Sequence, residues 1–234
     1  MRKPTPSERA RIRGLTDGID GYLSEHEALY LSRLAAHGPG AGAIVEIGSY
    51  YGKSTVLLAH ASREAGREKV VAIDPNKGGA AQPFHDNLAR AGVSDHVTPV
   101  VATSDAAAET WLGPVRLLWI DGAHTYEQVG RDFRFWTPFL VDGGIVAFHD
   151  TYEYEGVRRV IDEEVVPSPH FALVGLVDSI TAFRKRAALG AGERLQKLLL
   201  RRGRALYWMN GRRSLPGDLR RGLKRVLRMA SRTR

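Results

Sequence analysis

The sequence predicts an α/β protein in which helices flank a doubly wound, mostly parallel sheet of seven strands. The first observation is that short apolar runs alternate with helix-like segments from residue 43 onward, as in sheets covered on both faces. The second is that a run such as Arg116–Ile120 is almost continuously apolar, which is typical of a strand buried on both sides. The third is a glycine-containing turn directly after the first run, at Gly48 and Gly52.

The individual elements follow from local patterns. Ser24 and Glu27 form a capping box for a helix that runs to about His37, and Gly38 begins the turn that ends it. Further along, a helix is expected over 154–165, and a closing hairpin turns at Asp178. The expected strands cover residues 43–48, 70–74, 97–102, 115–121, 144–150, 171–177 and 180–183.

Length and composition exclude several classes of protein. The 234 residues are enough for one domain with appendages, and they contain no cysteine for a disulfide, a thiolate metal site or a nucleophile. No apolar run approaches the roughly 20 residues of a membrane span. The N-terminus, beginning Met1-Arg2-Lys3, lacks the apolar core of a signal peptide. We therefore expect a cytoplasmic location, with peripheral membrane association left open.

Charge divides the chain into an acidic body and a basic arm. Residues 1–183 hold 17 Lys and Arg against 24 Asp and Glu, whereas residues 184–234 hold 17 Lys and Arg against two acidic residues. A basic arm on an acidic body differs from a uniformly basic nucleic-acid binder. We predict a helical cap over 1–40, a cofactor-binding domain over 41–185 and a basic amphipathic extension over 186–234.

The segment from Val45 to Thr55 carries the most specific motif. An apolar run ends at Glu46, and a Gly-x-x-x-Gly loop then opens a helix-like segment, as in cofactor sites that use bare backbone N–H groups. A P-loop needs four residues between its glycines, but three separate Gly48 from Gly52. A dinucleotide fingerprint needs a glycine where Tyr50 stands. Both phosphate-binding motifs are therefore excluded by spacing.

The remaining pattern, Glu-x-Gly-x-x-x-Gly, resembles motif I of the class I S-adenosylmethionine-dependent methyltransferases. Those proteins have a Rossmann-like sheet of seven strands with a final hairpin. The resemblance implies that an acidic residue, here Glu46, serves the cationic methionine end of the cofactor. The cofactor-binding residues it predicts around this turn are Glu46, Gly48, Ser49, Tyr51 and Ser54. Tyr51 and its neighbour Tyr50 can equally be packing residues.

Polar residues follow the next two strands, where open parallel sheets bind ligands. Asp74 ends the second strand and is expected to accept hydrogen bonds from the ribose hydroxyls. Ser104 and Asp105 follow the third strand and are placed to meet the adenine edge. The alternative is that these residues cap the helices that come next. For Asp74 we favour cofactor binding over helix capping. For Ser104 and Asp105 the two interpretations have equal weight.

A second constellation closes the fourth and fifth strands. Asp121 and Asp150 end adjacent strands, so their carboxylates can share one hard divalent cation beside the methyl donor. His124 lies three residues after Asp121 and can take the proton of a metal-bound hydroxyl. The run from Leu117 to Thr151 resembles a bacterial methyltransferase family that includes macrolide-sugar O-methyltransferases and cephalosporin-hydroxylase-like proteins. More distantly it resembles catechol and caffeoyl-CoA O-methyltransferases.

This resemblance covers residues 21–185 and implies specific roles. It places a metal ligand at Asp121, a catalytic base at His124 and the remaining ligands at His149 and Asp150. His149 departs from the family, in which an acidic residue usually stands there, and imidazole is a poor ligand for Mg²⁺. The alternatives are a weakly bound metal, a metal other than magnesium, such as Mn²⁺, or a structural histidine.

The predicted function is methyl transfer from S-adenosylmethionine to a hydroxyl of a sugar, a glycan or a glycosylated metabolite, assisted by a divalent cation. The first alternative is a binding protein that keeps the cofactor fold without chemistry and serves as a membrane- or glycosyltransferase-associated binding module. A hydroxylase is disfavoured because no facial triad with clear spacing is present. The acceptor itself is not encoded in any transferable motif, and the resemblance implies a homo-oligomer.

The arm contains two amphipathic segments. Leu195, Leu198 and Leu199 fall on one helical face within 193–209, and a similar apolar face recurs within 219–230, opposite Arg and Lys residues. We predict an anionic membrane surface as a partner; a helix packed on the body or across a dimer, and a solvated arm, are the alternatives. Nucleic acid is not expected, because the body is acidic and the arm has few aromatic residues.

Overall fold

The structure is a computed structural model that describes residues 5–209, with side chains through residue 202. Seven strands form one sheet in the order β3-β2-β1-β4-β5-β7-β6. The first five are parallel, and β7 pairs antiparallel with both β5 and β6. The strands are β1 Ala43–Ile47, β2 Val70–Ile73, β3 Val97–Val100, β4 Val115–Ile120, β5 Leu140–Phe148, β6 Phe171–Val177 and β7 Ile180–Lys185. The predicted doubly wound sheet and its closing hairpin are confirmed.

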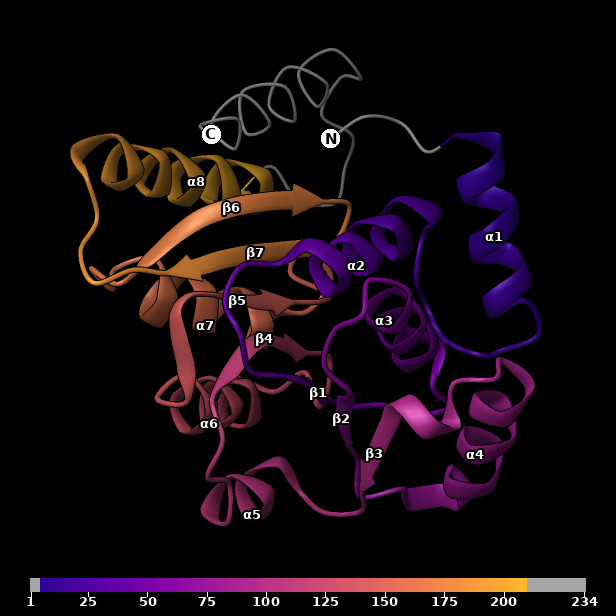
Figure 1. The fold of residues 1–234 in the computed structure, drawn as a ribbon. Helices are drawn as coiled ribbons and strands as arrows, with labels where there is room; N and C mark the ends of the chain where they lie inside the picture. The colour runs from indigo at the N-terminus through magenta and orange to yellow at the C-terminus, as the bar shows by residue number, and fades with distance from the viewer. Residues whose placement is uncertain (1–4, 210–234) are drawn as a thin grey trace.

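Helices cover both faces of the sheet (Figure 1). They are α1 Pro6–Thr16, α2 Glu25–His37, α3 Lys53–Glu64, α4 Ala81–Arg90, α5 Ser104–Glu109, α6 Tyr126–Trp136, α7 Glu155–Val160 and α8 Ala191–Met209, with short 3₁₀ turns at Lys77–Gly79 and Ser94–His96. The helix expected over 154–165 is α7 followed by a π-helical segment, Ile161–Val165. Strand β5 begins at Leu140, four residues earlier than expected, because Leu140 pairs with Val115 before the register shifts.

Two hydrophobic cores lie on opposite faces of the sheet because successive strand residues point to opposite sides. In β1, Val45 and Ile47 face the core formed with α5, α6 and α7, whereas Ile44 faces the core formed with α2, α3 and α4. All three side chains are almost completely buried. The carboxyl ends of the parallel strands are thereby held rigidly at one edge.

The capping box predicted for α2 is present. The Ser24 hydroxyl accepts a hydrogen bond from the Glu27 backbone N–H at 3.2 Å, and a Glu27 carboxylate oxygen accepts one from the Ser24 N–H at 2.8 Å. The Ser24 hydroxyl also donates to Asp178 in the β6–β7 turn. The start of α2 is therefore attached to the closing hairpin, 154 residues away in sequence.

Helix α8 lies along β6, at the outer strand of the sheet (Figure 1). Leu200 is buried in the core that contains Phe171, whereas Leu195, Leu198 and Leu199 are 57%, 45% and 40% exposed. The apolar face predicted from sequence therefore points away from the body. The second amphipathic segment, 219–230, lies outside the described residues. Within residues 5–209, no helix is long and apolar enough to cross a membrane.

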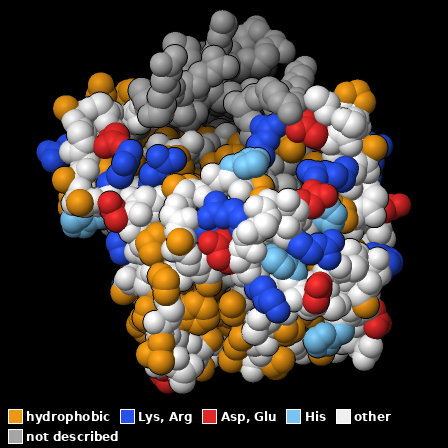
Figure 2. Space-filling view, in the orientation of Figure 1, with side chains coloured by type: hydrophobic (Ala, Val, Ile, Leu, Met, Phe, Trp, Pro, Cys, Tyr) orange, Lys and Arg blue, Asp and Glu red, His pale blue; other side chains and the backbone are white. Residues whose placement is uncertain are grey.

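Charges on the face seen in Figure 2 are mixed: Lys and Arg side chains lie among acidic and histidine side chains, and hydrophobic side chains gather lower down. Ion pairs among the described residues include Arg13–Glu25 and Arg11–Glu64. A continuous basic surface for a nucleic-acid backbone is not present on the described part of this face.

Candidate functional site

A cavity of about 590 Å³ opens at the carboxyl ends of β1, β4 and β5. Its walls come from the turn after β1, the turn after β4, the end of β5 and the segment between α1 and α2. The lining residues are Ile19, Asp20, Gly21, Tyr22, Leu23, Gly48, Ser49, Tyr50, Tyr51, Lys53, Ser54, Asp121, His124, His149 and Asp150. Eight residues predicted from sequence thus meet at one cavity.

The turn after β1 depends on two glycines with positive φ. Gly48 has φ +87°, and a Cβ atom there would lie 2.2 Å from the carbonyl oxygen of Asp121. Gly52 has φ +85° and donates its N–H to Ser49 at 2.7 Å, closing the turn at the start of α3. Between them Tyr50 also has a positive φ, and its ring stacks on Tyr51. The turn leaves the amino end of α3 open toward the cavity.

Asp74, at the end of β2, accepts a hydrogen bond from this turn. One carboxylate oxygen accepts the Tyr50 N–H at 2.9 Å, and the other accepts the Asn76 N–H at 2.7 Å. Asp74 does not cap a helix, because Asn76 and Ala80 occupy the N-cap positions that follow. It is half-buried and lies outside the set that lines the cavity. Its observed contacts order the β1–α3 turn and leave lone pairs for a ligand.

Glu46 is fully buried beneath the same turn. Burial raises the pKa of Glu46 to about 7, against the opposing hydrogen bonds from Ser54 and Thr55. The Thr55 hydroxyl donates to the Glu46 carboxylate at 2.5 Å. Glu46 therefore connects β1 to the first turn of α3 on the buried side of the β1–α3 turn. It does not line the cavity.

Ser104 and Asp105 begin α5 and also lie outside the cavity-lining set. The Ser104 hydroxyl donates to Asp132 of α6, and its carbonyl accepts the Trp136 indole N–H at 3.1 Å. Asp105 pairs with Arg131 at 3.4 Å. The N-cap position itself is occupied by Thr103. Ser104 is thus held toward α6, an arrangement that the sequence did not suggest.

The second constellation gathers at the ends of β4 and β5. Ligand atoms from Asp121, His124 and Asp150 lie within 4.8 Å of one another. Nε2 of His124 is 3.1 Å from Oδ2 of Asp150, and the imidazole ring stacks on Tyr154 with a centroid distance of 3.9 Å. Backbone packing fixes this loop, because a Cβ atom at Gly156 would lie 2.2 Å from the His124 carbonyl oxygen.

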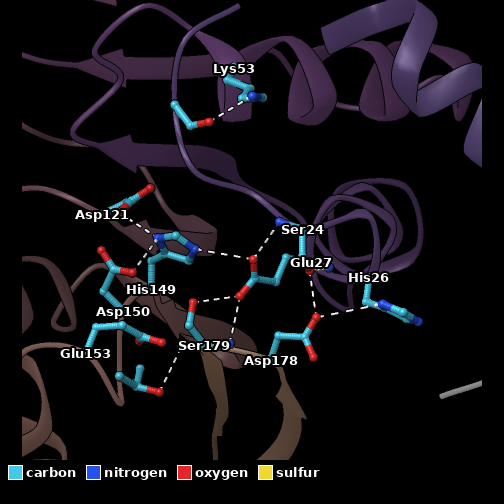
Figure 3. A network of polar contacts seen from close by, with 12 residues as sticks. Ser24, His26, Glu27, Lys53, Asp121, His149, Asp150, Glu153, Asp178 and Ser179 are labelled. Atoms are coloured by element: carbon cyan, nitrogen blue, oxygen red, sulfur yellow. Dashed lines mark hydrogen bonds and ion pairs between the residues drawn. The ribbon is translucent and has the colours of Figure 1, made fainter. Parts of the chain in front are cut away.

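His149 occupies the buried end of this cluster and is 4% exposed. Its Nδ1 lies 3.1 Å from Oδ1 of Asp121 and 3.5 Å from Oδ1 of Asp150, and its Nε2 lies 3.7 Å from Oε2 of Glu27 (Figure 3). Burial disfavours the charged ring, but the contacts with Asp121 and Glu27 outweigh burial and raise the pKa of His149 to about 10. His149 is thus a cation among three carboxylates at neutral pH.

Sequence reasoning assigned Glu27 only to a helix cap, but its carboxylate also faces His149. Burial works against its charge, yet contacts from His149 and Ser179 lower the pKa of Glu27 to about 2. Sequence reasoning also did not single out Lys53 or residues 19–23, which form one wall of the cavity. Lys53 holds that wall by donating to the Gly21 carbonyl at 2.8 Å. The distance in sequence between these segments explains why no local pattern revealed them.

Comparison with known proteins agrees with the fold described above. Residues 45–151 match the family described as "Methyltransferase domain". The cofactor-bound protein Rv0187 from MTB has a similar fold, with 21% identity, a TM-score of 0.61 and coverage of 78% of this chain and 91% of that chain. An O-methyltransferase from Bacillus cereus in complex with SAH has 20% identity, a TM-score of 0.59 and coverage of 78% and 92%.

A third similar structure is CalS11, a TDP-rhamnose 3'-O-methyltransferase of calicheamicin biosynthesis. It has 18% identity, a TM-score of 0.54 and coverage of 79% of this chain and 96% of that chain. The sheet order agrees with the Rossmann-like fold of these structures, and the match over residues 45–151 identifies a methyltransferase domain. This match agrees with the methyltransferase resemblance seen in the sequence.

Proposed function

We propose that this protein transfers the methyl group of S-adenosylmethionine to a hydroxyl of a sugar, a glycan or a glycosylated metabolite. The observation that carries the proposal is that one cavity joins the Gly48 turn to the Asp121, His124 and Asp150 cluster. In this proposal the cofactor lies over the turn at Ser49, Tyr51 and Ser54, and its sulfonium methyl faces the cluster.

The reaction is a displacement at a cationic methyl carbon. The acceptor oxygen forms the new bond to that carbon, the carbon–sulfur bond breaks, and the cofactor leaves as a neutral thioether. The protein aligns the two reactants and removes the hydroxyl proton. We assign proton removal to the His124 imidazole, and Asp150, whose Oδ2 lies 3.1 Å from Nε2, can stabilise the imidazolium that results.

The polar cluster fits a divalent cation in part. Asp121 and Asp150 offer carboxylate oxygens, which Mg²⁺ and Mn²⁺ prefer, and His124 offers a nitrogen within the same 4.8 Å. His149 fits poorly as a ligand because Nδ1 already contacts Asp121 and Nε2 faces Glu27. When bound, such a cation lowers the pKa of an acceptor hydroxyl. We propose Asp121 and Asp150 as its protein ligands.

A carbohydrate acceptor is favoured by the cavity walls. Tyr22 is 94% and Tyr50 51% exposed, and Asp20 lies beside Tyr22 in the same wall. Aromatic rings next to carboxylates suit sugars, which present both C–H faces and hydroxyl groups. The similarity to a rhamnose O-methyltransferase supports the same class of acceptor.

The exposed face of α8 supports a proposed site of membrane association. Leu195, Leu198 and Leu199 form an exposed apolar strip on a chain segment, 184–234, that carries 17 Lys and Arg. Apolar side chains beside many cations suit an anionic lipid surface. We also propose that the chain forms a homo-oligomer, as its family resemblance implies.

The direct test is a methyl-transfer screen with labelled S-adenosylmethionine against mono- and oligosaccharides, run with Mg²⁺, with Mn²⁺ and with EDTA. Labelled sugar product supports the proposal, and loss of product in EDTA that either ion restores supports the metal. Cofactor binding by calorimetry without transfer to any hydroxyl acceptor would instead favour a binding protein.

A further inference from the structure

Glu27, near the amino end of α2, contacts His149, which lines the cavity. Glu27 is 4% exposed, and its oxygens face two different directions. Oε1 accepts hydrogen bonds from the Ser179 N–H at 2.7 Å and the Ser179 hydroxyl at 2.6 Å. Oε2 accepts the Ser24 N–H at 2.8 Å and lies 3.7 Å from Nε2 of His149. Figure 3 shows Glu27 between the hairpin turn and the imidazole ring.

His149 links Glu27 to Asp121, which lines the cavity. Its ring lies between Glu27 on one side and Asp121 on the other, and Nδ1 is within hydrogen-bond distance of Oδ1 of Asp121. A histidine whose two nitrogens face two carboxylates has its ring orientation fixed by them. Asp121 in turn has one oxygen engaged, so its other oxygen is the one left for a ligand in the cavity.

We infer that Glu27 is a positioning residue of the site: through His149 it fixes the orientation of the Asp121 carboxylate. The inference rests on the proposed function, because Asp121 is assigned there to the reacting groups. Removing the Glu27 charge leaves Nε2 of His149 buried and facing no carboxylate, and the ring can then turn away from Asp121. A misplaced Asp121 side chain affects the reaction more than cofactor binding, because the Gly48 turn contacts Asp121 through backbone atoms.

The test compares Glu27→Gln with a matched control in the same cap. Glu27→Gln keeps the shape and removes the charge, whereas Ser24→Ala weakens the same helix cap and the bond to Asp178 without touching His149. For Glu27→Gln we expect kcat to fall on the order of 10- to 100-fold while the affinity for S-adenosylhomocysteine stays within about twofold. Ser24→Ala should lose thermal stability but keep its kcat within about twofold.

A second measurement does not depend on turnover. In ¹⁵N-histidine-labelled wild-type protein, the His149 ring should give protected N–H resonances at neutral pH, assigned by their absence in His149→Gln. Glu27→Gln should broaden or shift them, and Glu27→Asp, which keeps the charge, should restore them and part of kcat. Unchanged resonances in Glu27→Gln, or equal kcat in Glu27→Gln and Ser24→Ala, would overturn the inference. An inactive wild-type protein with the predicted resonance changes would overturn only the proposed function.

Discussion

Gly48 and Asp121 approach so closely that no side chain fits between them: a Cβ atom on Gly48 would lie 2.2 Å from the Asp121 carbonyl oxygen and 2.7 Å from the Gly122 Cα. The Asp121 N–H also donates to the Ile47 carbonyl at 2.9 Å, so the ends of β1 and β4 are joined there. The cofactor turn and the polar cluster therefore share one rigid boundary, and a change at Gly48 affects both.

Substituting Gly48 should abolish cofactor binding. Gly48→Val adds a branched side chain against backbone atoms that cannot withdraw, in addition to the cost of a positive φ. We expect no S-adenosylmethionine binding by calorimetry. Gly66→Ala is the control, because Gly66 has φ +63° with nothing within 4 Å of its added Cβ. That variant should lose about 1–2 kcal/mol of stability and bind normally; unchanged affinity in Gly48→Val would contradict the assigned cofactor turn.

Removing the Asp74 carboxylate should weaken cofactor binding. Asp74→Ala leaves the Tyr50 and Asn76 N–H groups without their acceptor and removes the proposed partner of the ribose. The loss is expected to be about 1.5–3 kcal/mol per charged hydrogen bond, which calorimetry with S-adenosylhomocysteine measures. Asp86→Ala, at an exposed position on α4, should bind like wild type. Equal affinities for all three proteins would remove Asp74 from the site.

Substituting His124 should lower turnover without changing cofactor affinity. His124→Ala removes the proposed base and the stack on Tyr154, so kcat should fall roughly 10²- to 10⁴-fold while cofactor affinity is kept. His37→Ala, at an exposed position in the last turn of α2, is the control. Asp121→Ala should also lose any dependence of the rate on Mg²⁺ or Mn²⁺. Full turnover of His124→Ala at neutral pH would assign the base elsewhere.

Stability should depend on pH through Asp132. Burial raises the pKa of Asp132 to about 6, above the 3.8 of an unhindered aspartate. A raised carboxyl pKa means that the folded protein holds the proton more tightly. This contribution is fully present below pH 3.8 and is lost as pH rises through 6, by about 3 kcal/mol in total. Asp132→Asn should lack that loss in denaturation curves from pH 4 to 8, whereas Asp95→Asn, at an exposed position, should follow wild type.

Membrane association should depend on the exposed leucines of α8. Leu195→Ser with Leu198→Ser should reduce co-sedimentation with anionic vesicles at low salt, while Leu112→Ser, exposed elsewhere, should not. Deleting residues 210–234 removes cations and keeps Leu200 on the body, so it should weaken pelleting and spare cofactor binding. A deletion from residue 186 would uncover the Leu200 contact. Equal, negligible pelleting of wild type and variants would reject the lipid surface.

The sequence alone determined the architecture and most of the cavity-lining set. Strand period, the capping box at Ser24 and the turn at Asp178 are local patterns, so their elements were predicted to within a few residues. Gly48, Asp121, His124 and Asp150 were found because residues at the ends of parallel strands must meet at one edge of the sheet. The resemblance of the Gly48 motif to methyltransferases agrees with the family match over residues 45–151.

Tertiary structure decided which side chains face one another across that edge. The contact of Glu27 with His149, and that of Ser104 with Asp132, join residues 122 and 28 positions apart, and each forms only when separate elements pack. Periodicity predicts which face of its own helix a residue occupies. It does not predict which side chains of the neighbouring element lie against that face. Packing therefore made His149 a partner of two carboxylates, a role that its position after β5 did not reveal.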